Sequence, residues 1–230
     1  MSKVEKLIRK LRRPPTAHNW VKSIKGRRDE TAKALHDFAL NPPRSSLLAA
    51  IGICVQIVVD GISSAQAQKC VEKIKKDGDR ERASWIIRAF SAHAKAQGWS
   101  GIQVFRDMVE FYHVSAGVKV PVKPTFVLND DGKLVPYFVI AWSRMDLSPY
   151  QLRILGTIIQ EAILTLEDFQ GSDAVIVCTP VAPYCKKERQ VFEYRVSNFE
   201  PLTDEEKQEL FDRYAGAMDD AEKMLIESLG

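Results

Sequence analysis

Apolar residues recur with helical spacing through the first half of the chain. The clearest stripe has members three and four positions apart: Ala83, Ile86, Ile87, Phe90 and Ala94. This spacing places side chains on one face of a helix. Weaker stripes predict helices over 4–11, 31–40 and 65–76. Behind a Ser-x-x-Gln capping box at 100–103, the spacing of Ile102, Phe105, Val109 and Tyr112 predicts another helix.

The longest apolar run, residues 47–59, is 13 residues long and is interrupted by Gly52 and Gln56. A membrane span needs roughly 20 apolar residues, so the run predicts a buried element of a globular protein. Helix is favoured, but the Ile/Val-rich part, 53–59, is also compatible with a buried strand.

The pattern changes after His113. Alternating or continuous β-branched segments at 117–122, 125–128, 134–142, 173–179 and 190–196 predict strands. An Asn-Asp-Asp-Gly sequence at 129–132 predicts a hairpin between the second and third of them. Capping boxes at 148–151 and 203–206 predict two long helices, the first over 149–169.

These elements predict an α+β fold: a helical N-terminal half packed on a small mixed α/β domain with a hairpin-led sheet of about five strands. The 149–169 helix has the apolar arc needed to cover that sheet. We divide the chain into a basic arm (1–28), a helical region (29–116) and an α/β domain (117–230). No linker-like stretch separates the last two, so one continuous body fits equally well.

The composition is ordinary, but the charge is unevenly distributed. The 230 residues are 45% hydrophobic and 27% charged, which excludes a disordered or collagenous chain. Residues 1–33 hold 11 basic and 3 acidic side chains, whereas residues 121–230 hold 11 and 19. Such asymmetry within a net charge of +3 is a feature of chains with a polyanionic partner.

The basic arm is the candidate site. Lys and Arg supply the phosphate contacts that dominate non-specific nucleic-acid binding, and an interleaved Trp can stack on a base. The candidate contacts to DNA or RNA are Lys6, Arg9, Lys10, Arg12, Arg13, Trp20, Lys22, Lys25, Arg27 and Arg28, with Lys3 ahead of them. Trp20 and Ile24 are alternatively anchors that dock the arm, and the arm could then lie on the acidic half of its own chain or of a neighbour.

The order helix, three strands, helix, strand resembles the core of PD-(D/E)XK nucleases. That family places a carboxylate on the second strand and an acid-x-Lys pair on the third, because a divalent metal needs oxygen ligands. Asp130 and Asp131 follow the second strand here, but the third strand, Val139 to Ser143, carries neither acid nor Lys. Glu161 on the next helix is expected to point away from the sheet into solvent.

No other motif indicates an enzyme. P-loop, dinucleotide-binding, zincin, serine-hydrolase and zinc-ribbon patterns do not occur, and the four histidines lack metal-ligand spacing, so we predict no cofactor, metal or catalytic residue. Cys54, Cys70, Cys178 and Cys185 form no CxxC pair, and no leader or membrane segment is apparent, which favours reduced thiols in a cytoplasmic protein.

Three functions fit the sequence. The preferred hypothesis is a non-enzymatic binding or adaptor protein that contacts nucleic acid through its basic arm. The first alternative is a structural or interaction subunit that self-associates, or binds a protein partner, through its oppositely charged ends. The second alternative is a degenerate or atypical PD-(D/E)XK-like metal-dependent nuclease.

Overall fold

The computed structural model describes residues 2–41, 47–99, 108–115, 117–145 and 147–229. Its centre is a four-stranded sheet in the order β3-β4-β5-β8. The strands are Phe126–Asp130 (β3), Lys133–Ile140 (β4), Val175–Cys178 (β5) and Phe192–Arg195 (β8). β4 and β5 are parallel, and the two outer strands are antiparallel to their neighbours. The predicted α+β fold is confirmed.

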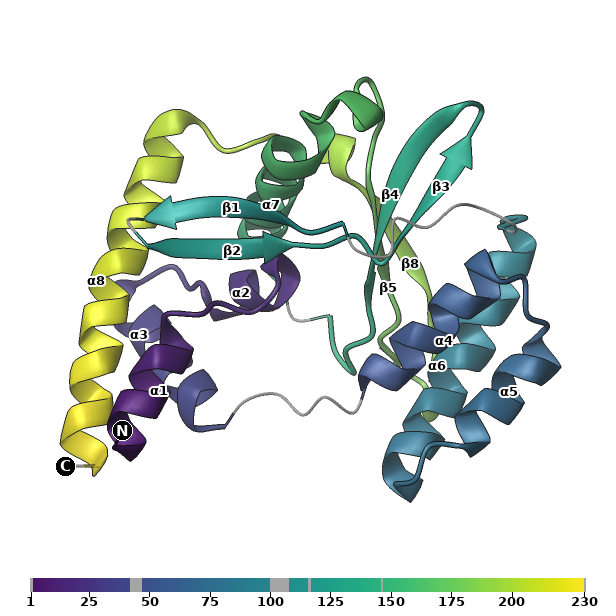
Figure 1. Cartoon of the computed structure of the whole chain (residues 1–230), viewed down its shortest axis with the longest axis horizontal. Helices are drawn as coiled ribbons and strands as arrows, with labels where there is room; N and C mark the ends of the chain where they lie inside the picture. The colour runs from purple at the N-terminus through teal and green to yellow at the C-terminus, as the bar shows by residue number, and fades with distance from the viewer. Residues whose placement is uncertain (1, 42–46, 100–107, 116, 146, 230) are drawn as a thin grey trace.

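One face of the sheet is covered by both ends of the chain (Figure 1). The helices on this side are Lys3–Leu11 (α1), Ala17–Ser23 (α2), Arg28–Leu40 (α3), Pro149–Ile159 (α7) and Asp204–Leu229 (α8). A separate ribbon of Glu110–Ser115 (β1) and Val118–Val122 (β2) packs with them. Ile154, Ile158 and Ile163 meet Phe138 and Ile176 of the sheet in this core, so the 149–169 segment covers the sheet as predicted.

The other face is covered by the remaining helices, Leu48–Val59 (α4), Ser64–Glu72 (α5) and Asp77–Ala96 (α6). Val139 and Val177 point to this side, whereas their strand neighbours point to the first core. Side chains alternate across a strand, so an almost wholly apolar β4 and β5 can fill both cores. The helices of the N-terminal half therefore divide between the two faces of one sheet.

The structure settles or corrects three local predictions. The 47–59 run is a helix, because its apolar residues continue around a helical turn and Cys54 and Val58 are fully buried. The helix predicted through Val109 and Tyr112 is wrong in its described part: Met108 and Val109 are not helical, and strand β1 begins at Glu110. There the chain alternates exposed and buried positions as strand β1, and residues 100–107 of that prediction lie outside the described part.

The segment between the strands predicted at 173–179 and 190–196 contains a further pair of strands. Val181–Ala182 (β6) pairs with Cys185–Arg189 (β7) as a short hairpin, because Pro183 and Tyr184 between them form the turn. The predicted sheet of about five strands is thus a four-stranded sheet with two separate two-stranded ribbons.

Gln151 joins α7 to the N-terminal helices. Its side-chain oxygen accepts from the backbone N–H of Ser148 in the predicted capping box. Its nitrogen donates to the carbonyls of Val21 and Ile24, at 3.0 and 2.7 Å, where α2 ends. One buried side-chain amide therefore forms hydrogen bonds with backbone groups at the start of α7 and at the end of α2.

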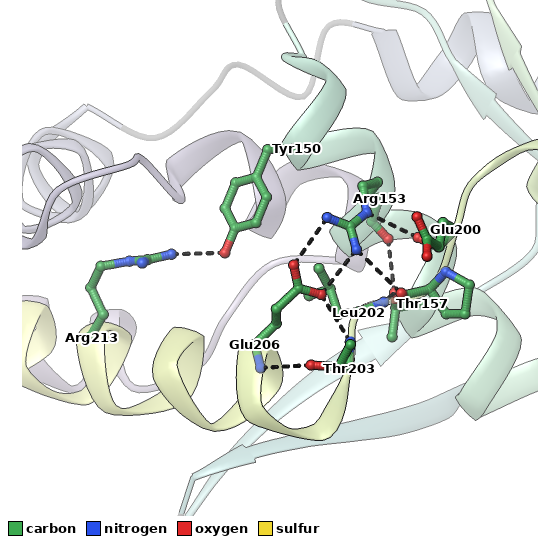
Figure 2. Close-up of polar contacts among 9 residues, drawn as sticks. Tyr150, Arg153, Thr157, Glu200, Leu202, Thr203, Glu206 and Arg213 are labelled. Atoms are coloured by element: carbon green, nitrogen blue, oxygen red, sulfur yellow. Dashed lines mark hydrogen bonds and ion pairs between the residues drawn. The ribbon is translucent and has the colours of Figure 1, made fainter.

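A second joint fixes the start of α8 on α7 (Figure 2). Arg153 makes a two-pronged ion pair with Glu206 at 2.9 and 3.1 Å and also donates to the carbonyl of Glu200. Thr157 accepts from the backbone N–H of Leu202. None of the described helices has both the length and the apolar character needed to cross a membrane.

Gly52 offers a test of the surface of α4. It lies within the helix, and a Cβ added there would meet no atom within 4 Å. We expect Gly52→Ala to raise the free energy of unfolding by about 0.5–1 kcal/mol, because alanine has less backbone entropy to lose. Gly61, with φ of +64° just after α4, is the matched control, and alanine there should destabilise. Urea unfolding measures the free energy of unfolding of both variants. A lower value for Gly52→Ala than for the wild-type protein would mean that this surface of α4 has no room for a side chain.

Candidate functional site

The basic N-terminal segment is folded against the body of the protein. α1 packs on α3 and α8 through Leu7, Ile8 and Leu11, and Leu11 is only 2% exposed (Figure 1). The opposite side of the helix is polar, with Lys6 and Arg9 exposed. The segment is therefore a docked pair of helices rather than an extended arm.

Trp20 is the main anchor of this segment. Its side chain is 1% exposed, and its ring meets Tyr214 of α8 edge-on with centroids 5.2 Å apart. Ile24 is equally buried. A ring that stacks on a base needs a free face, so the stacking role considered for Trp20 does not fit this geometry. The alternative, that Trp20 and Ile24 dock the segment, does fit.

Two of the ten candidate residues form ion pairs with α8. Arg12 donates to both carboxylate oxygens of Glu222 at 2.7 and 3.0 Å, and this contact raises the pKa of the Arg12 guanidinium. Arg28 does the same with Asp220 at 2.7 and 2.8 Å, which lowers the pKa of that carboxyl. The Arg28 guanidinium occupies the space where a side chain at Gly216 would begin.

Three further candidates are engaged within the chain. Arg27 pairs with carboxylates in the first turn of α3. The Lys10 amine donates to the carbonyl of Ala39 at 3.0 Å. The Lys22 amine lies 4.4 Å from the ring centroid of Trp142, a cation–π distance.

Most of the remaining candidates form a cationic face on α1 and the residues just after it. Lys6, Arg9 and Arg13 are exposed and have no ion pair with any described residue, and the same holds for Lys3 beside them. Helical positions advance by about 100° per residue, so Lys6 and Arg9 lie on the side of α1 opposite its apolar stripe, and Arg13 follows two residues after the helix ends. Lys25, half-buried after α2, also lacks a side-chain partner in the described part.

Sequence reasoning missed a cleft of about 980 Å³ that opens where β4 ends. One wall is the outer face of α4, with Leu48, Ile51 and Val55. The facing wall carries Thr16, His18 and Asn19 at the start of α2. Thr16, His18 and Asn19 are close together in the sequence, but only the three-dimensional fold brings them into one cleft with α4.

His18 is held as a neutral imidazole in this wall. The Asn19 amide nitrogen donates to His18 Nε2 at 2.9 Å, and Thr16 Oγ1 lies 3.3 Å from the same nitrogen. Burial lowers the pKa of His18 to about 4. With Nε2 accepting, the proton of the neutral ring resides on Nδ1.

Arg189 fixes the chain next to this cleft. Its Nη1 donates to the carbonyls of Trp142 and Thr179, both at 3.0 Å, which follow the parallel strands β4 and β5. The residue is 7% exposed, and burial lowers the pKa of its guanidinium. The cation thus ties β7 to the carboxyl ends of both strands, the edge at which open α/β sheets commonly bind ligands.

The geometry gives the nuclease hypothesis no carboxylate cluster. Asp130 and Asp131 are exposed at the β3–β4 turn, at the opposite end of the hairpin from the cleft, where Thr125 and Val139 lie. Among the described residues, no three His, Cys, Asp or Glu side chains are grouped to hold a metal ion. β4 contributes Val139 and Ile140 to the cleft, and neither has a metal-ligating side chain.

Glu161 points away from the sheet, as its helical position predicts, but it is not simply solvated. It accepts from the Tyr112 hydroxyl at 2.9 Å and from the Lys207 amine at 2.7 Å. It lies in a π-helical turn, Gln160–Leu164, that follows α7. The carboxylate therefore joins β1, this turn and α8, and it belongs to the scaffold.

Comparison with protein-family models, curated proteins and solved structures gives no match to this chain.

The burial of Trp20 predicts that apolar packing, rather than charge, docks the N-terminal segment. Trp20→Ala should lower the free energy of unfolding by about 3–5 kcal/mol, because it leaves a cavity beside Tyr214. Arg12→Ala should lower the free energy of unfolding much less than Trp20→Ala does, since the Arg12 side chain is 64% exposed in its ion pair. Urea unfolding measures the loss of stability in both variants. Equal losses in Trp20→Ala and Arg12→Ala would contradict docking by apolar packing.

The neutral His18 predicts a pH-dependent stability. Its pKa is about 4 in the folded protein against 6.5 for the free side chain, so the unfolded chain binds more protons between these values. Stability should fall as the pH drops from about 6.5 to about 4, by at most about 3 kcal/mol from this group. His18→Gln should flatten this part of the urea-unfolding profile, and His113→Gln, at an exposed position, should not.

Proposed function

We propose that the protein is a non-enzymatic nucleic-acid-binding protein of the cytoplasm that contacts the phosphate backbone through the cationic face of α1. The observation that carries this proposal is that α1 buries its apolar side in the core while Lys6 and Arg9 project from the other side and Arg13 is exposed just after the helix, all three without ion-pair partners in the described part. The four unpaired cysteines agree with a reducing compartment.

A docked helix suits phosphate contact better than a free arm. The backbone of α1 is ordered before binding, so association costs only the entropy of a few side chains. Phosphate contacts fix position without reading sequence, and DNA and RNA share them. We therefore infer sequence-tolerant binding to either nucleic acid.

The alternative of self-association through oppositely charged ends draws less support. Arg12 and Arg28 already pair with Glu222 and Asp220 within one chain. Ion pairs between two copies would have to replace these ion pairs within one chain. Replacing one exposed ion pair by another yields little binding free energy.

The test is a triple variant, Lys6→Ala/Arg9→Ala/Arg13→Ala. We expect it to weaken binding of labelled DNA and RNA at least tenfold at low salt. It should also reduce the slope of log K against log salt by about 2 to 3 for a duplex, since each phosphate contact contributes about 0.9. Fluorescence anisotropy over a salt series measures both quantities.

The matched control is Lys73→Ala/Lys75→Ala/Lys76→Ala. These three lysines are also exposed but lie between α5 and α6, in the layer that covers the other face of the sheet. This variant should bind nearly as tightly as the wild-type protein. Equal losses in the two triple variants, or no binding by the wild-type protein, would overturn the proposed function.

A further inference from the structure

The outer face of α4 is apolar except for Gln56, yet it is not covered by the described residues. Toward the core, α4 buries Cys54 and Val58 completely. On the outside, Leu48 is 66% exposed, and Ile51 and Val55 line the cleft. A helix that is apolar on all sides is normally buried on all sides. The cleft wall formed by this face therefore has the character of a surface that receives an apolar ligand face.

The facing wall offers hydrogen bonds without charge. His18 Nδ1 and the side-chain oxygen of Asn19 have no partner among the described residues, because the contacts within this wall use His18 Nε2 and the Asn19 nitrogen. The amide of Gln56 lines the cleft as well and is similarly unpaired in the described part. Such groups recognise the polar edge of a neutral ring.

One cation lies in the cleft lining. Lys123 is exposed and has no ion pair with any described residue, and it precedes the buried Pro124. A residue before proline is restricted to extended backbone, which limits where the amine can reach. Asp60, which follows α4, also lines the cleft, so the lining carries one cation and one carboxylate, and an anionic group of a ligand would pair with Lys123.

We propose that this cleft binds a nucleotide. The base lies flat on the α4 wall, its polar edge faces His18 and Asn19, and its phosphate is held by Lys123. The volume of about 980 Å³ is at the upper end of the range of about 300–1,000 Å³ for small-ligand sites, so a nucleotide and part of its neighbour both fit. The inference rests on the proposed function only where the nucleotide belongs to a strand that α1 also contacts.

The lining favours a nucleotide over an apolar chain. An acyl chain would cover α4 but would remove water from His18, Asn19 and Gln56 without replacing its hydrogen bonds, which is costly. A heterocycle satisfies both walls, because its faces are apolar and its edge carries donors and acceptors.

The first test fills the cleft from Gly52. A side chain there enters open space, so Gly52→Leu should fold normally and narrow the cleft. Isothermal titration with deoxyadenosine and deoxythymidine monophosphates should show saturable binding to the wild-type protein and at least tenfold weaker binding to Gly52→Leu. Gly52→Ala, the matched control, should change affinity by less than twofold.

The second test removes the anion contact. Lys123→Ala should weaken the binding of deoxyadenosine monophosphate about fivefold or more. It should leave the affinity for deoxyadenosine, which lacks the phosphate, unchanged. Lys119→Ala, an exposed lysine on β2 outside the cleft, should leave both unchanged. Equal effects of Lys123→Ala on the nucleoside and the nucleotide would refute the phosphate contact.

Competition separates the two sources of the nucleotide. If short single-stranded DNA displaces the mononucleotide, the cleft binds nucleotides of a strand. If it does not, the cleft binds free nucleotides. Both results support nucleotide binding in the cleft. The Lys6/Arg9/Arg13 triple variant should bind mononucleotides normally, so failure of the α1 interface is distinguishable. Binding of decanoate but of no nucleotide, or nucleotide binding unaffected by Gly52→Leu, would overturn the inference.

Discussion

The packing of Trp20 against Tyr214 is the contact on which the arrangement of the N-terminal half depends. It holds α2 on α8, and the amide of Gln151 then fixes the end of α2 on α7. With α2 in place, His18 faces the outer side of α4 across the cleft, and α1 lies on α8 with its charged side outward. Burial of one aromatic ring thus sets the position of both candidate binding surfaces.

Much of the fold could be predicted from the sequence, because its signals are local. The capping boxes at 148–151 and 203–206 form as predicted, and the stripe through Ile86 and Phe90 is fully buried. Where prediction failed, a local signal had two meanings. Val109 and Tyr112 are three positions apart, which fits a helix, but Tyr112 and Val114 alternate as in the strand that forms. A periodicity of a few residues cannot separate these cases.

The sites were less predictable, because they depend on which distant segments meet. Clustered cations identify a basic segment, but only the fold shows that Arg12 and Arg28 pair with α8 while Lys6 and Arg9 remain exposed. The apolar run of α4 is visible in the sequence, whereas its partial exposure is not. His18 gave no signal at all, since its role depends on neighbours that the fold supplies.

The unequal use of the basic residues explains how a nearly neutral chain can present the locally cationic surface on which the proposed function rests. At physiological ionic strength, charges more than about 8 Å apart in solvent are largely screened, so a nucleic acid responds to the local charge pattern and not to the net charge of +3. Arg12 and Arg28 neutralise Glu222 and Asp220 of α8, the carboxylates to which they are paired. This pairing moderates repulsion of phosphate next to α1, which leaves Lys6, Arg9 and Arg13 to attract it. The ion pairs therefore matter less for stability than for the sign of the potential around α1.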